Sequence, residues 1–460
     1  MKSWILIFLS ASCFAATHTV KSGSSIQSAL EKAKSGDTVE VYPGVYTELI
    51  LMDKENVRLI GKLQNGEWPT LDGSNKKNDG IIASGSNLEI AYFKIKNFKG
   101  NGVTTQGADH VRMHHLIVEN TGLYGIYPTR GSYITIEDTV TSGIADAGIY
   151  VGMCSHVEVR RNEVFNNVAG IEIENSEHVI VEDNYAHNNT GGILAFTLPG
   201  LPVKHSDSII LRRNIVESNN HDNFGAPSST VGSLPPGTGM VVLAGNNVQI
   251  EDNIIRNNVT GGLILSDMSF IDDMSAPDPE VDPKFKNIKV YRNLFYENGK
   301  KPRGKMVKLL LAVKHLSLSG GDIITNGDGK DNCLFKGLGA NVIGAKDFTE
   351  CKEGATTKDV VTVLATSKEL TSVQKARSSD LGTKVYNNVC AGCHASNISL
   401  IGPPLQELQK KYHGNARGIV EFAFAPSKIR SKYPAMPSQN YLGKEKLQAA
   451  AEFILKVKTN

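Results

Sequence analysis

Glycine followed by an alternating apolar segment recurs along the first two thirds of the chain at a nearly constant interval. The repeated glycines are Gly80, Gly102, Gly125, Gly148, Gly170, Gly192, Gly239 and Gly262. Successive members are 22 or 23 residues apart, except for one interval of 47 residues that begins at Gly192. The long interval fits two repeats, or one repeat that carries an inserted loop. A fixed period of this length indicates a stack of similar units.

A second repeat lies between these glycines and ends in asparagine. An apolar residue, two mostly charged residues and an asparagine recur at Asn162, Asn184, Asn214, Asn253 and Asn293. Short alternating strands cannot bury their apolar face alone, but three strands per turn, stacked turn upon turn, enclose a continuous core. Asparagine and glycine suit the positive-φ corners between strands, and stacked asparagines can bond to one another. The pattern predicts an all-β parallel β-helix.

The N-terminus has the pattern of a secretory signal peptide over residues 1–16. Lys2 precedes an apolar run at residues 4–9, and small residues follow it. This predicts a periplasmic or extracellular protein, with a lipid anchor at Cys13 as the second interpretation. No later segment is long and apolar enough to predict a transmembrane helix. The 49 basic and 47 acidic residues nearly cancel, which argues against a nucleic-acid partner.

The residues after the signal peptide predict a cap for the solenoid. Ser24 and Gln27 have capping-box spacing at the start of a helix that ends near Gly36, and a strand follows at residues 38–41. This segment resembles the N-terminal cap of right-handed β-helices in the pectate-lyase-like superfamily. The resemblance implies a right-handed parallel β-helix, with this capping helix, over residues 17–351.

The C-terminal region contains the sequence Cys390-Ala391-Gly392-Cys393-His394, which is the attachment pattern of covalent c-type haem. Two thiols at this spacing can form thioethers to haem, and the adjacent His394 can then bind the iron as an axial ligand. A redox dithiol would not require the histidine, and a zinc site would need a second ligand pair, which does not follow. Residues 402–405 are placed to offer His394 a backbone acceptor for its other ring nitrogen.

Residues 379–460 resemble class I cytochromes c, an all-α family in which the first and last helices cross. In that family the sixth iron ligand is a methionine in a loop before the last helix, and Met436 matches it. His413, the other strong donor of this region, is better suited to the surface. The resemblance implies one haem c per chain, electron transfer and a redox partner protein.

The whole chain also resembles a family of exported parallel-β-helix repeat proteins that are paired with, or fused to, a small cytochrome-like partner. The residues that carry this resemblance are the loop 221–225 and the Pro-Pro-Gly-Thr-Gly segment 235–239. The role of that family is unassigned, so the resemblance implies a fold and no substrate.

Two connecting regions remain. Residues 352–378 are rich in Lys, Thr and Ser and predict an exposed linker that proteases cut easily. Cys333 and Cys351 are a candidate disulfide in an exported protein, although their spacing leaves open whether they are bonded.

The β-helix itself offers weak candidates for chemistry. Aligning the repeats on their glycines puts Tyr127, Tyr150 and Glu172 in one outward column and Glu174 in the next, a ladder that could bind a polysaccharide. A solvated β face is the favoured interpretation of these columns. The neighbours His221 and Asp222 could form a general base, or an ordinary turn.

An acidic stretch suggests a calcium site, with a solvated loop as the favoured interpretation. Its residues are Asp272, Asp273, Asp278, Glu280 and Asp282.

Four functions are compatible with these features, of which a structural or adhesion solenoid with a tethered electron carrier ranks third and metal-cofactor maturation on a β-helix scaffold fourth. The leading hypothesis is a periplasmic or envelope redox protein whose β-helix binds a partner or a carbohydrate. The alternative is a carbohydrate-active enzyme, such as a polysaccharide lyase, epimerase or hydrolase, that carries a cytochrome tail.

Overall fold

The computed structural model of the chain describes residues 15–227, 229–268, 278–304, 318–326, 331–335, 339–355, 357–366, 371–427 and 433–459. Residues 1–14 of the predicted signal peptide, including Cys13, lie outside these ranges. Among the described residues, no helix combines the length and apolar character needed to span a membrane.

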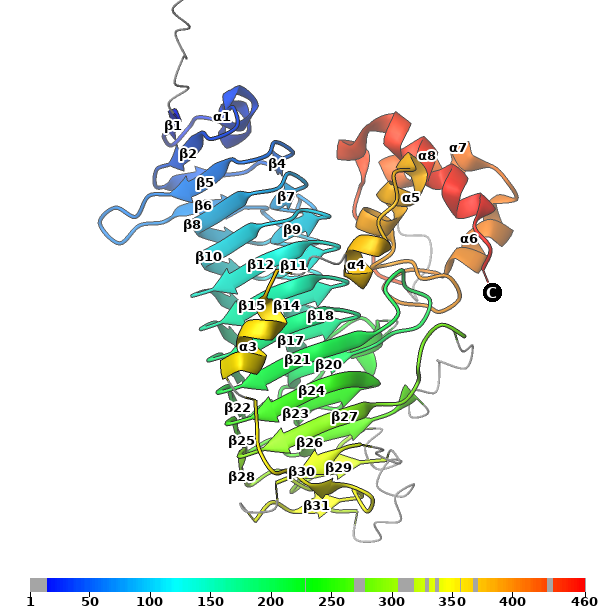
Figure 1. Ribbon diagram of the computed structural model, residues 1–460. Helices are drawn as coiled ribbons and strands as arrows, with labels where there is room; N and C mark the ends of the chain where they lie inside the picture. Colours follow the sequence, from blue (N-terminus) through cyan, green and yellow to red (C-terminus); the bar gives the residue numbers. More distant parts are fainter. Residues whose placement is uncertain are drawn as a thin grey trace, which may run out of the picture.

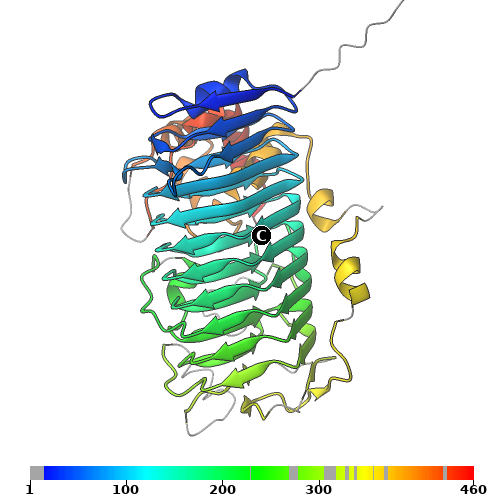
Figure 2. The same ribbon diagram turned by 90° about the vertical axis from the view of Figure 1, so that its left-hand side faces the viewer.

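The solenoid is built from turns of three short strands, as the repeats predict (Figures 1 and 2). One turn consists of β14 (Ala147–Gly152), β15 (Ser155–Arg160) and β16 (Glu163–Phe165). The next consists of β17 (Ala169–Glu174), β18 (Glu177–Glu182) and β19 (Tyr185–His187). Each strand pairs in parallel with its counterpart one turn on, and inward residues such as Ile149 and Ile171 stack into one core.

The paired strands form two sheets. The smaller one, called here the eleven-stranded sheet, consists of β4 (Ile50–Met52), β7 (Ile81–Ala83), β9 (Val103–Gln106), β11 (Ile126–Thr129), β14, β17, β20 (Gly191–Phe196), β23 (Thr238–Leu243), β26 (Gly261–Ser266), β29 (Ile323–Thr325) and β31 (Val342–Ile343).

The larger sheet carries the two other strands of each turn. Besides β15, β16, β18 and β19 it contains β1 (Thr17–Val20), β2 (Thr38–Val41), β3 (Gly44–Tyr46), β5 (Arg58–Gly61), β6 (Pro69–Asp72), β8 (Leu88–Lys96), β10 (Val111–Glu119), β12 (Ser132–Glu137), β13 (Val140–Ser142), β21 (Ser206–Arg212), β22 (Ile215–Glu217), β24 (Gly245–Glu251), β25 (Ile254–Arg256), β27 (Lys286–Tyr291), β28 (Leu294–Tyr296), β30 (Cys333–Leu334) and β32 (Thr349–Glu350).

The interval of 47 residues is a single turn with insertions. Strand β20 pairs directly with β23, so that Ile193 lies opposite Met240. The extra residues form loops on either side of β21 and β22, and the second loop includes the 3-10 helix η1 (Thr230–Ser233).

The repeated glycines allow close stacking and do not provide positive-φ corners. A Cβ on Gly125 would lie 2.4 Å from the carbonyl oxygen of Gly148, and one on Gly170 would lie 2.5 Å from that of Gly192. No side chain fits at such a distance, so each turn requires glycine at this position. The corners are instead taken largely by non-glycine residues, with Asn166 and Asn188 at φ 53° and 54°.

Two asparagine ladders run along the solenoid, as predicted. In the first, Nδ2 of Asn162 donates to Oδ1 of Asn184, and Nδ2 of Asn184 donates to Oδ1 of Asn214, each at 3.0 Å. A second ladder includes Asn189, which donates to Asn219 at 2.9 Å. Each ladder also satisfies buried backbone groups: the backbone N–H of Asn162 donates to Oδ1 of Asn184 at 3.0 Å. The ladders therefore hold the register of successive turns.

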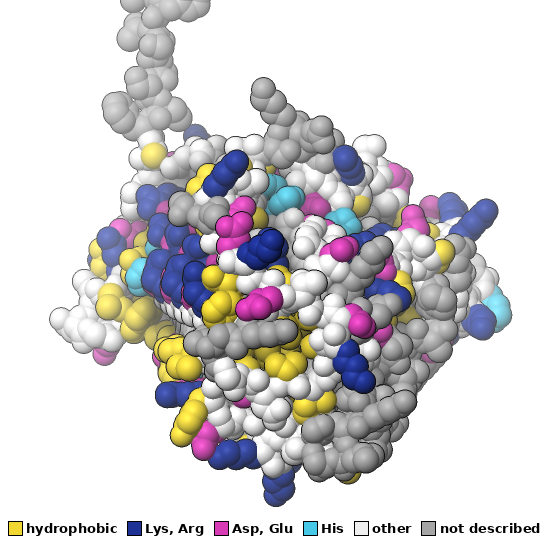
Figure 3. All heavy atoms as spheres, turned by 60° about the horizontal axis from the view of Figure 1, so that its bottom comes forward, with side chains coloured by type: hydrophobic (Ala, Val, Ile, Leu, Met, Phe, Trp, Pro, Cys, Tyr) yellow, Lys and Arg dark blue, Asp and Glu magenta, His cyan; other side chains and the backbone are white. Residues whose placement is uncertain are grey.

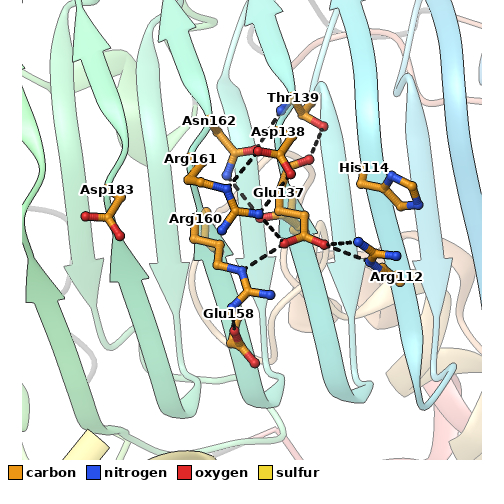
Figure 4. Close-up of polar contacts among 12 residues, drawn as sticks. Arg112, His114, Glu137, Asp138, Thr139, Glu158, Arg160, Arg161, Asn162 and Asp183 are labelled. Carbon is orange, nitrogen blue, oxygen red and sulfur yellow. Dashed lines mark hydrogen bonds and ion pairs between the residues drawn. The ribbon is translucent and has the colours of Figure 1, made fainter. Parts of the chain in front are cut away.

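The charged residues before each asparagine alternate in sign from turn to turn. Glu137 lies opposite Arg160, Arg160 opposite Glu182, and Glu182 opposite Arg212. The neighbouring column alternates in the same way through Asp138, Arg161, Asp183, Arg213, Asp252 and Arg292. Figure 4 shows Glu137 at the centre of three arginines, with Nε of Arg160 at 2.8 Å and Arg112 and Arg161 at 2.6 Å. Rows of Lys and Arg side chains are visible on one flank of the molecule (Figure 3).

The solenoid is closed at its N-terminal end by helix α1 (Ile26–Lys32). The predicted cap position is wrong by one residue, because the side chain of Ser25 accepts from the backbone of Ser28. The carboxylate of Glu48 accepts from the free backbone N–H groups of Ile26 and Gln27. This contact between distant residues satisfies the first turn, which the local Ser24–Gln27 spacing could not reveal.

The far end of the solenoid contains two short final turns. Strand β29 pairs with β31 and β30 pairs with β32. Cys333 and Cys351 form a disulfide there, with their Cα atoms 4.9 Å apart. Cys154 is free and buried in the core.

The composition of residues 352–378 predicts an exposed linker, but two described parts of this segment, helix α3 (Thr357–Leu364) and residues 371–377, pack against the β-helix. Helix α3 lies along the larger sheet, where Val363 packs with Ile180 and Ile210. Helix α4 (Ser372–Lys375) follows. We call residues 371–377 the strap, because they fasten the C-terminal domain to the β-helix.

Ion pairs and hydrogen bonds hold the strap in place. Arg377 donates to both carboxylate oxygens of Asp109, at 2.7 and 2.6 Å, and to the backbone oxygen of Arg130 at 2.9 Å. Arg130 in turn donates to the backbone oxygen of Ala376 at 2.9 Å. These partners are more than two hundred residues apart, so composition alone did not indicate them.

The C-terminal domain is helical and lies against the eleven-stranded sheet (Figure 1). Helix α5 (Leu381–Val385) continues as a π-helical turn, η3 (Tyr386–Cys390). Helices α6 (Leu405–Tyr412) and α7 (Ala416–Phe424), the 3-10 turn η4 (Asn440–Leu442) and α8 (Gly443–Lys456) follow. Helices α5 and α8 cross as expected, at a point where a Cβ on Gly382 would be 2.5 Å from the carbonyl oxygen of Ala449.

Candidate functional site

The Cys-Ala-Gly-Cys-His segment begins at the end of the first helix of the C-terminal domain. Cys390 ends η3, and the backbone N–H groups of Cys393 and His394 donate to its carbonyl at 3.1 and 2.9 Å. The hydroxyl of Tyr386 donates to the carbonyl of His394 at 2.6 Å and so ties the end of this segment to the helix that precedes it. Cys390 and Cys393 are free, and both line one cavity together with His394.

His394 is oriented by the segment that the sequence indicated. Its Nδ1 lies 2.8 Å from the carbonyl oxygen of Pro403, so Nδ1 is the donor and Nε2 carries the free lone pair. Burial lowers the pKa of His394 below its ordinary value and favours the neutral ring. Gly402 permits this arrangement, because a Cβ there would lie 2.4 Å from Cε1 of the imidazole.

Met436 lines the same cavity as His394. It is half-buried and packs against Val420, Ala423 and Leu447. His413 lies elsewhere, in the left-handed conformation that ends α6, with φ 43°. The cavity therefore brings together the two cysteines, the histidine and the methionine that the sequence singled out.

The β-helix forms one wall of this cavity, which the sequence did not predict. Its contribution comes from Asp79, Ile82, Asn101, Thr104, Gln106, Leu123, Tyr124, Tyr127 and Thr129. Nε2 of Gln106 donates to the hydroxyl of Tyr441 at 2.8 Å across the boundary. The hydroxyls of Thr104 and Thr129 are buried and have no hydrogen-bond partner among the described residues.

The residues present fit a c-type haem. Two thiols, a neutral imidazole with a free nitrogen and a thioether are the donor set of such a site, and an apolar cavity surrounds them. The unpartnered hydroxyls of Thr104 and Thr129 are available to a polar edge of a bound group. When bound, the haem supplies a one-electron redox centre, and the protein orients it, excludes water and sets its potential.

The outward columns that could have bound a glycan are covered by the C-terminal domain. Glu172 and Glu174 are 1% and 2% exposed, and Tyr150 and Tyr127 are 4% and 8% exposed. Tyr127 and Tyr150 share an apolar cluster with Ala391, Ile398 and Ile401 of the haem-attachment region. The favoured expectation of a solvated face is therefore wrong, because the sequence pattern did not show that a second domain docks here.

Docking leaves three carboxyl groups in an apolar environment. Burial raises the pKa of Asp146 to about 8, and burial together with the charge of Asp146 raises that of Glu174 to about 8. The same two causes raise the pKa of Glu172 well above its ordinary value. All three groups line a small cavity whose opposite wall includes Gly392 of the attachment loop. We call these three side chains the carboxyl cluster.

His221 and Asp222 do not form a dyad with the carboxyl cluster. The Nδ1 of His221 lies 2.7 Å from the backbone oxygen of Asp222, and the Asp222 carboxylate pairs with Arg303 at 2.5 Å. Both residues are exposed. This is the geometry of an ion-paired surface turn, so the described contacts assign these residues no role in catalysis.

The described part of the acidic stretch does not form a calcium site. The carboxylate of Asp278 accepts from Lys204 at 2.6 Å and from the backbone of Gly200 at 3.0 Å. Asp282 pairs with Lys286 at 3.0 Å. Among the described residues no group of three His, Cys, Asp or Glu side chains is arranged to hold a metal ion. Asp272 and Asp273 lie outside the described residues.

Together, the fold and the cavity define a right-handed parallel β-helix that carries a cytochrome c domain. Residues 379–458 match the cytochrome c family, and residues 79–199 match the right-handed β-helix region. No curated protein matches the chain.

The chain is similar in fold to several solved structures, including the following three. The A-module of the mannuronan C-5 epimerase AlgE4 from Azotobacter vinelandii is 16% identical, with a TM-score of 0.46 and coverage of 67% of this chain and 90% of that one. An alginate lyase from Paenibacillus sp. strain FPU-7 is 14% identical, with a TM-score of 0.42 and coverage of 61% and 98%.

A DFA-IIIase from Arthrobacter chlorophenolicus A6 is 13% identical, with a TM-score of 0.45 and coverage of 73% and 97%. At such identities a likeness extends to the fold and does not assign an activity.

Proposed function

We propose that this chain is an exported electron-transfer protein that binds one haem c covalently through Cys390 and Cys393. In this proposal His394 and Met436 are the axial ligands, and a one-electron carrier is the redox partner. The observation that carries the proposal is the hydrogen bond from Nδ1 of His394 to Pro403, which leaves Nε2 free in the cavity that Met436 also lines.

Each residue has a defined task in this function. The carbonyl of Pro403 fixes the His394 tautomer and ring plane, which strengthens the ring as an iron ligand. The thioether of Met436 would raise the reduction potential relative to a second nitrogen ligand. The apolar walls from both domains exclude water from the cavity.

The β-helix acts in this proposal as a scaffold for the cytochrome domain. It supplies one wall of the haem cavity and holds the domain by the strap. Polysaccharide binding at Tyr127, Tyr150, Glu172 and Glu174 is not favoured, because the cytochrome domain occupies that face. Export is supported by the predicted signal peptide and by the Cys333–Cys351 disulfide, which persists in an oxidising compartment.

Haem attachment is tested on the full chain expressed with a cytochrome c maturation system. Covalent haem should remain with the denatured protein and give a pyridine haemochrome of the c type. The variants Cys390→Ser and Cys393→Ser should each lose one thioether, whereas Cys154→Ala, which changes a free cysteine outside the motif, should keep both. Haem that is extracted into acidified organic solvent from the wild-type protein would contradict the proposal.

The sixth ligand is tested separately. Met436→Ala should lose the long-wavelength charge-transfer band of thioether-ligated ferric haem, and its midpoint potential should fall. His413→Ala should change neither property. Retention of the band in Met436→Ala would exclude this methionine.

A further inference from the structure

The carboxyl cluster is a group of buried acidic side chains, several of whose oxygens have no hydrogen-bond partner in the described part of the protein. Asp146, Glu172 and Glu174 are each less than 5% exposed. Both carboxyl oxygens of Glu172 and one of Glu174 have no hydrogen-bond partner among the described residues. Burying an unpaired carboxylate is strongly unfavourable, so the groups avoid the cost by holding protons.

No Lys, Arg or His side chain of the described ranges forms an ion pair with the cluster. The phenols of Tyr124 and Tyr150 line the cavity of the cluster. Tyr124, Tyr127 and Cys393 also interact electrostatically with its carboxyl groups, and these interactions disfavour negative charge. The rest of the lining is Phe196, Leu198, Thr230, Val231, Leu400, Ile401 and Gly392 of the attachment loop. Glu137 differs from the cluster in this respect. Burial raises its pKa, but its three arginine partners outweigh burial and lower the pKa to about 2.

The cluster lies beside the haem-attachment loop. Its cavity has a volume of about 20 Å³ and is bounded by Gly392, which separates Ala391 from Cys393 in the motif. This space is enough for one water molecule, which could bridge the carboxyl groups. Burial, then Cys390, and after it the charges of Asp146 and Glu174 raise the pKa of the Cys393 thiol to about 12, so these two carboxyl groups interact electrostatically with the attachment loop. Because Gly392 and Cys393 belong to the proposed haem-attachment loop, the charge of a bound haem would act on the cluster through a buried, apolar region.

We infer that the carboxyl cluster is a proton-exchange site coupled to the haem, so that Asp146, Glu172 and Glu174 take up a proton when an electron is added to the iron and release it on oxidation. This inference rests on the proposed haem function. In the balanced step a one-electron donor is oxidised, ferric iron becomes ferrous, and one proton from water binds a carboxylate of the cluster. The net charge at the buried interface is then unchanged.

The direction of the coupling follows from electrostatics. An added electron raises the proton affinity of a nearby carboxylate, so reduction is easier when a proton can follow. At a pH below the pKa values of the cluster, the groups are already protonated and the midpoint potential does not vary with pH. At higher pH the potential falls, by up to about 59 mV per pH unit for one proton and one electron.

The test is a potentiometric titration of the haem-loaded full chain between about pH 6 and pH 10, with a visible absorption readout. The wild-type midpoint should decrease with pH on the alkaline side of this range. The combined variant Asp146→Asn, Glu172→Gln, Glu174→Gln keeps the shape of the protonated groups, and its midpoint should lose the decrease. Glu251→Gln, which changes a carboxyl that is 2% exposed and lies on β24 of the larger sheet, should behave as the wild type.

Asp79 is the competing group, since it lines the haem cavity itself and burial raises its pKa to about 6. Asp79→Asn should leave the alkaline decrease in place. Loss of the decrease in Asp79→Asn, or its survival in the combined cluster variant, would overturn the inference.

Infrared spectroscopy gives a measurement that needs no variant. The difference between reduced and oxidised wild-type protein at alkaline pH should contain a positive carbonyl band of protonated carboxylic acid, shifted in D₂O. A covalent haem protein without this band and with a pH-independent midpoint would overturn only this inference. A chain that binds no covalent haem would instead contradict the proposed function.

Discussion

The hydroxyl of Tyr127 lies against the α-carbon of Gly392, so closely that a Cβ at position 392 would be 2.1 Å from the oxygen. Tyr127 belongs to the β-helix and Gly392 to the haem-attachment loop. The glycine in the middle of the Cys-Ala-Gly-Cys-His segment is thus required by docking between the two domains. Haem attachment itself needs only the two cysteines and the histidine.

Gly392→Ala should weaken this docking without preventing haem attachment. The added methyl group must displace the Tyr127 ring, and such overpacking costs about 1–3 kcal/mol. Thermal unfolding followed separately by haem absorbance and by far-ultraviolet circular dichroism should show a lower midpoint for the haem domain. Tyr127→Phe removes the clashing oxygen and should restore much of the loss when combined with Gly392→Ala. Equal losses with and without Tyr127→Phe would contradict the role of this contact.

Arg377→Ala should release the strap from the β-helix. The variant loses two hydrogen bonds to Asp109 and one to the carbonyl of Arg130, and charge-assisted bonds of this kind contribute about 1.5–3 kcal/mol each. Cleavage near residues 366–379 by thermolysin, which does not depend on arginine, should become at least about tenfold faster. The control is Lys375→Ala, which changes an exposed strap residue and should have little effect. Rapid cleavage of the wild-type strap would show that it is not docked.

Asn184→Ala should destabilise the solenoid by about 3 kcal/mol. The change removes the acceptor of the buried Asn162 N–H and the donor to the carbonyl of Val159. Denaturant unfolding monitored by circular dichroism measures the loss. Asn166→Gly, at an exposed corner with φ 53°, keeps the local backbone conformation and should change stability by only a few tenths of a kcal/mol. Similar effects of both changes would argue against the ladder.

Glu137→Gln should lower stability in a pH-dependent way. Burial opposes ionisation of Glu137, but hydrogen bonds from Arg160, Arg112 and Arg161 outweigh it and lower its pKa from 4.5 to about 2. A lowered folded-state pKa contributes stability that is complete above pH 4.5 and is lost as the pH falls towards 2.

The difference in unfolding free energy between the wild type and Glu137→Gln should therefore be about 2 kcal/mol near neutral pH and should shrink in acid. Glu158→Gln, which removes a more exposed partner of Arg160, is the matched control and should change stability by less than about 0.5 kcal/mol. A difference that does not vary between pH 5 and pH 2 would contradict the assignment.

Those features that depend on local spacing could be predicted from the sequence. The interval between Gly125 and Gly148 indicated one turn of the solenoid, because each turn needs a glycine where it stacks closely on the next. Asn162 and Asn184 indicated a ladder, because each turn needs an asparagine at the same position to bond to its neighbour. The proposed haem ligand His394 and its acceptor Pro403 were equally local, since they are nine residues apart.

The docking of the two domains could not be predicted in this way. The sequence pattern places Tyr127 on the surface of the β-helix, whereas in the structure the haem-attachment loop covers it. No sequence periodicity connects Tyr127 with Gly392, which it contacts. Arg377 lies in a segment of polar composition, and its partners are a single carboxylate and a backbone oxygen on the β-helix. The carboxyl cluster is hidden for the same reason, because Glu172 and Glu174 alternate along their strand as exposed residues would.

The alternation of charge along the solenoid gives its middle section a true repeat of two turns. Arg161 bonds to Asp138 and Arg213 to Asp183, always with the acid one turn earlier. Deletion or duplication of a single turn would stack either arginine on arginine or acid on acid at the new junction, whereas a change by two turns would restore every pair. During evolution this section can therefore gain or lose turns in steps of two without creating like-charge contacts. The charges at its corners determine which turns can be neighbours.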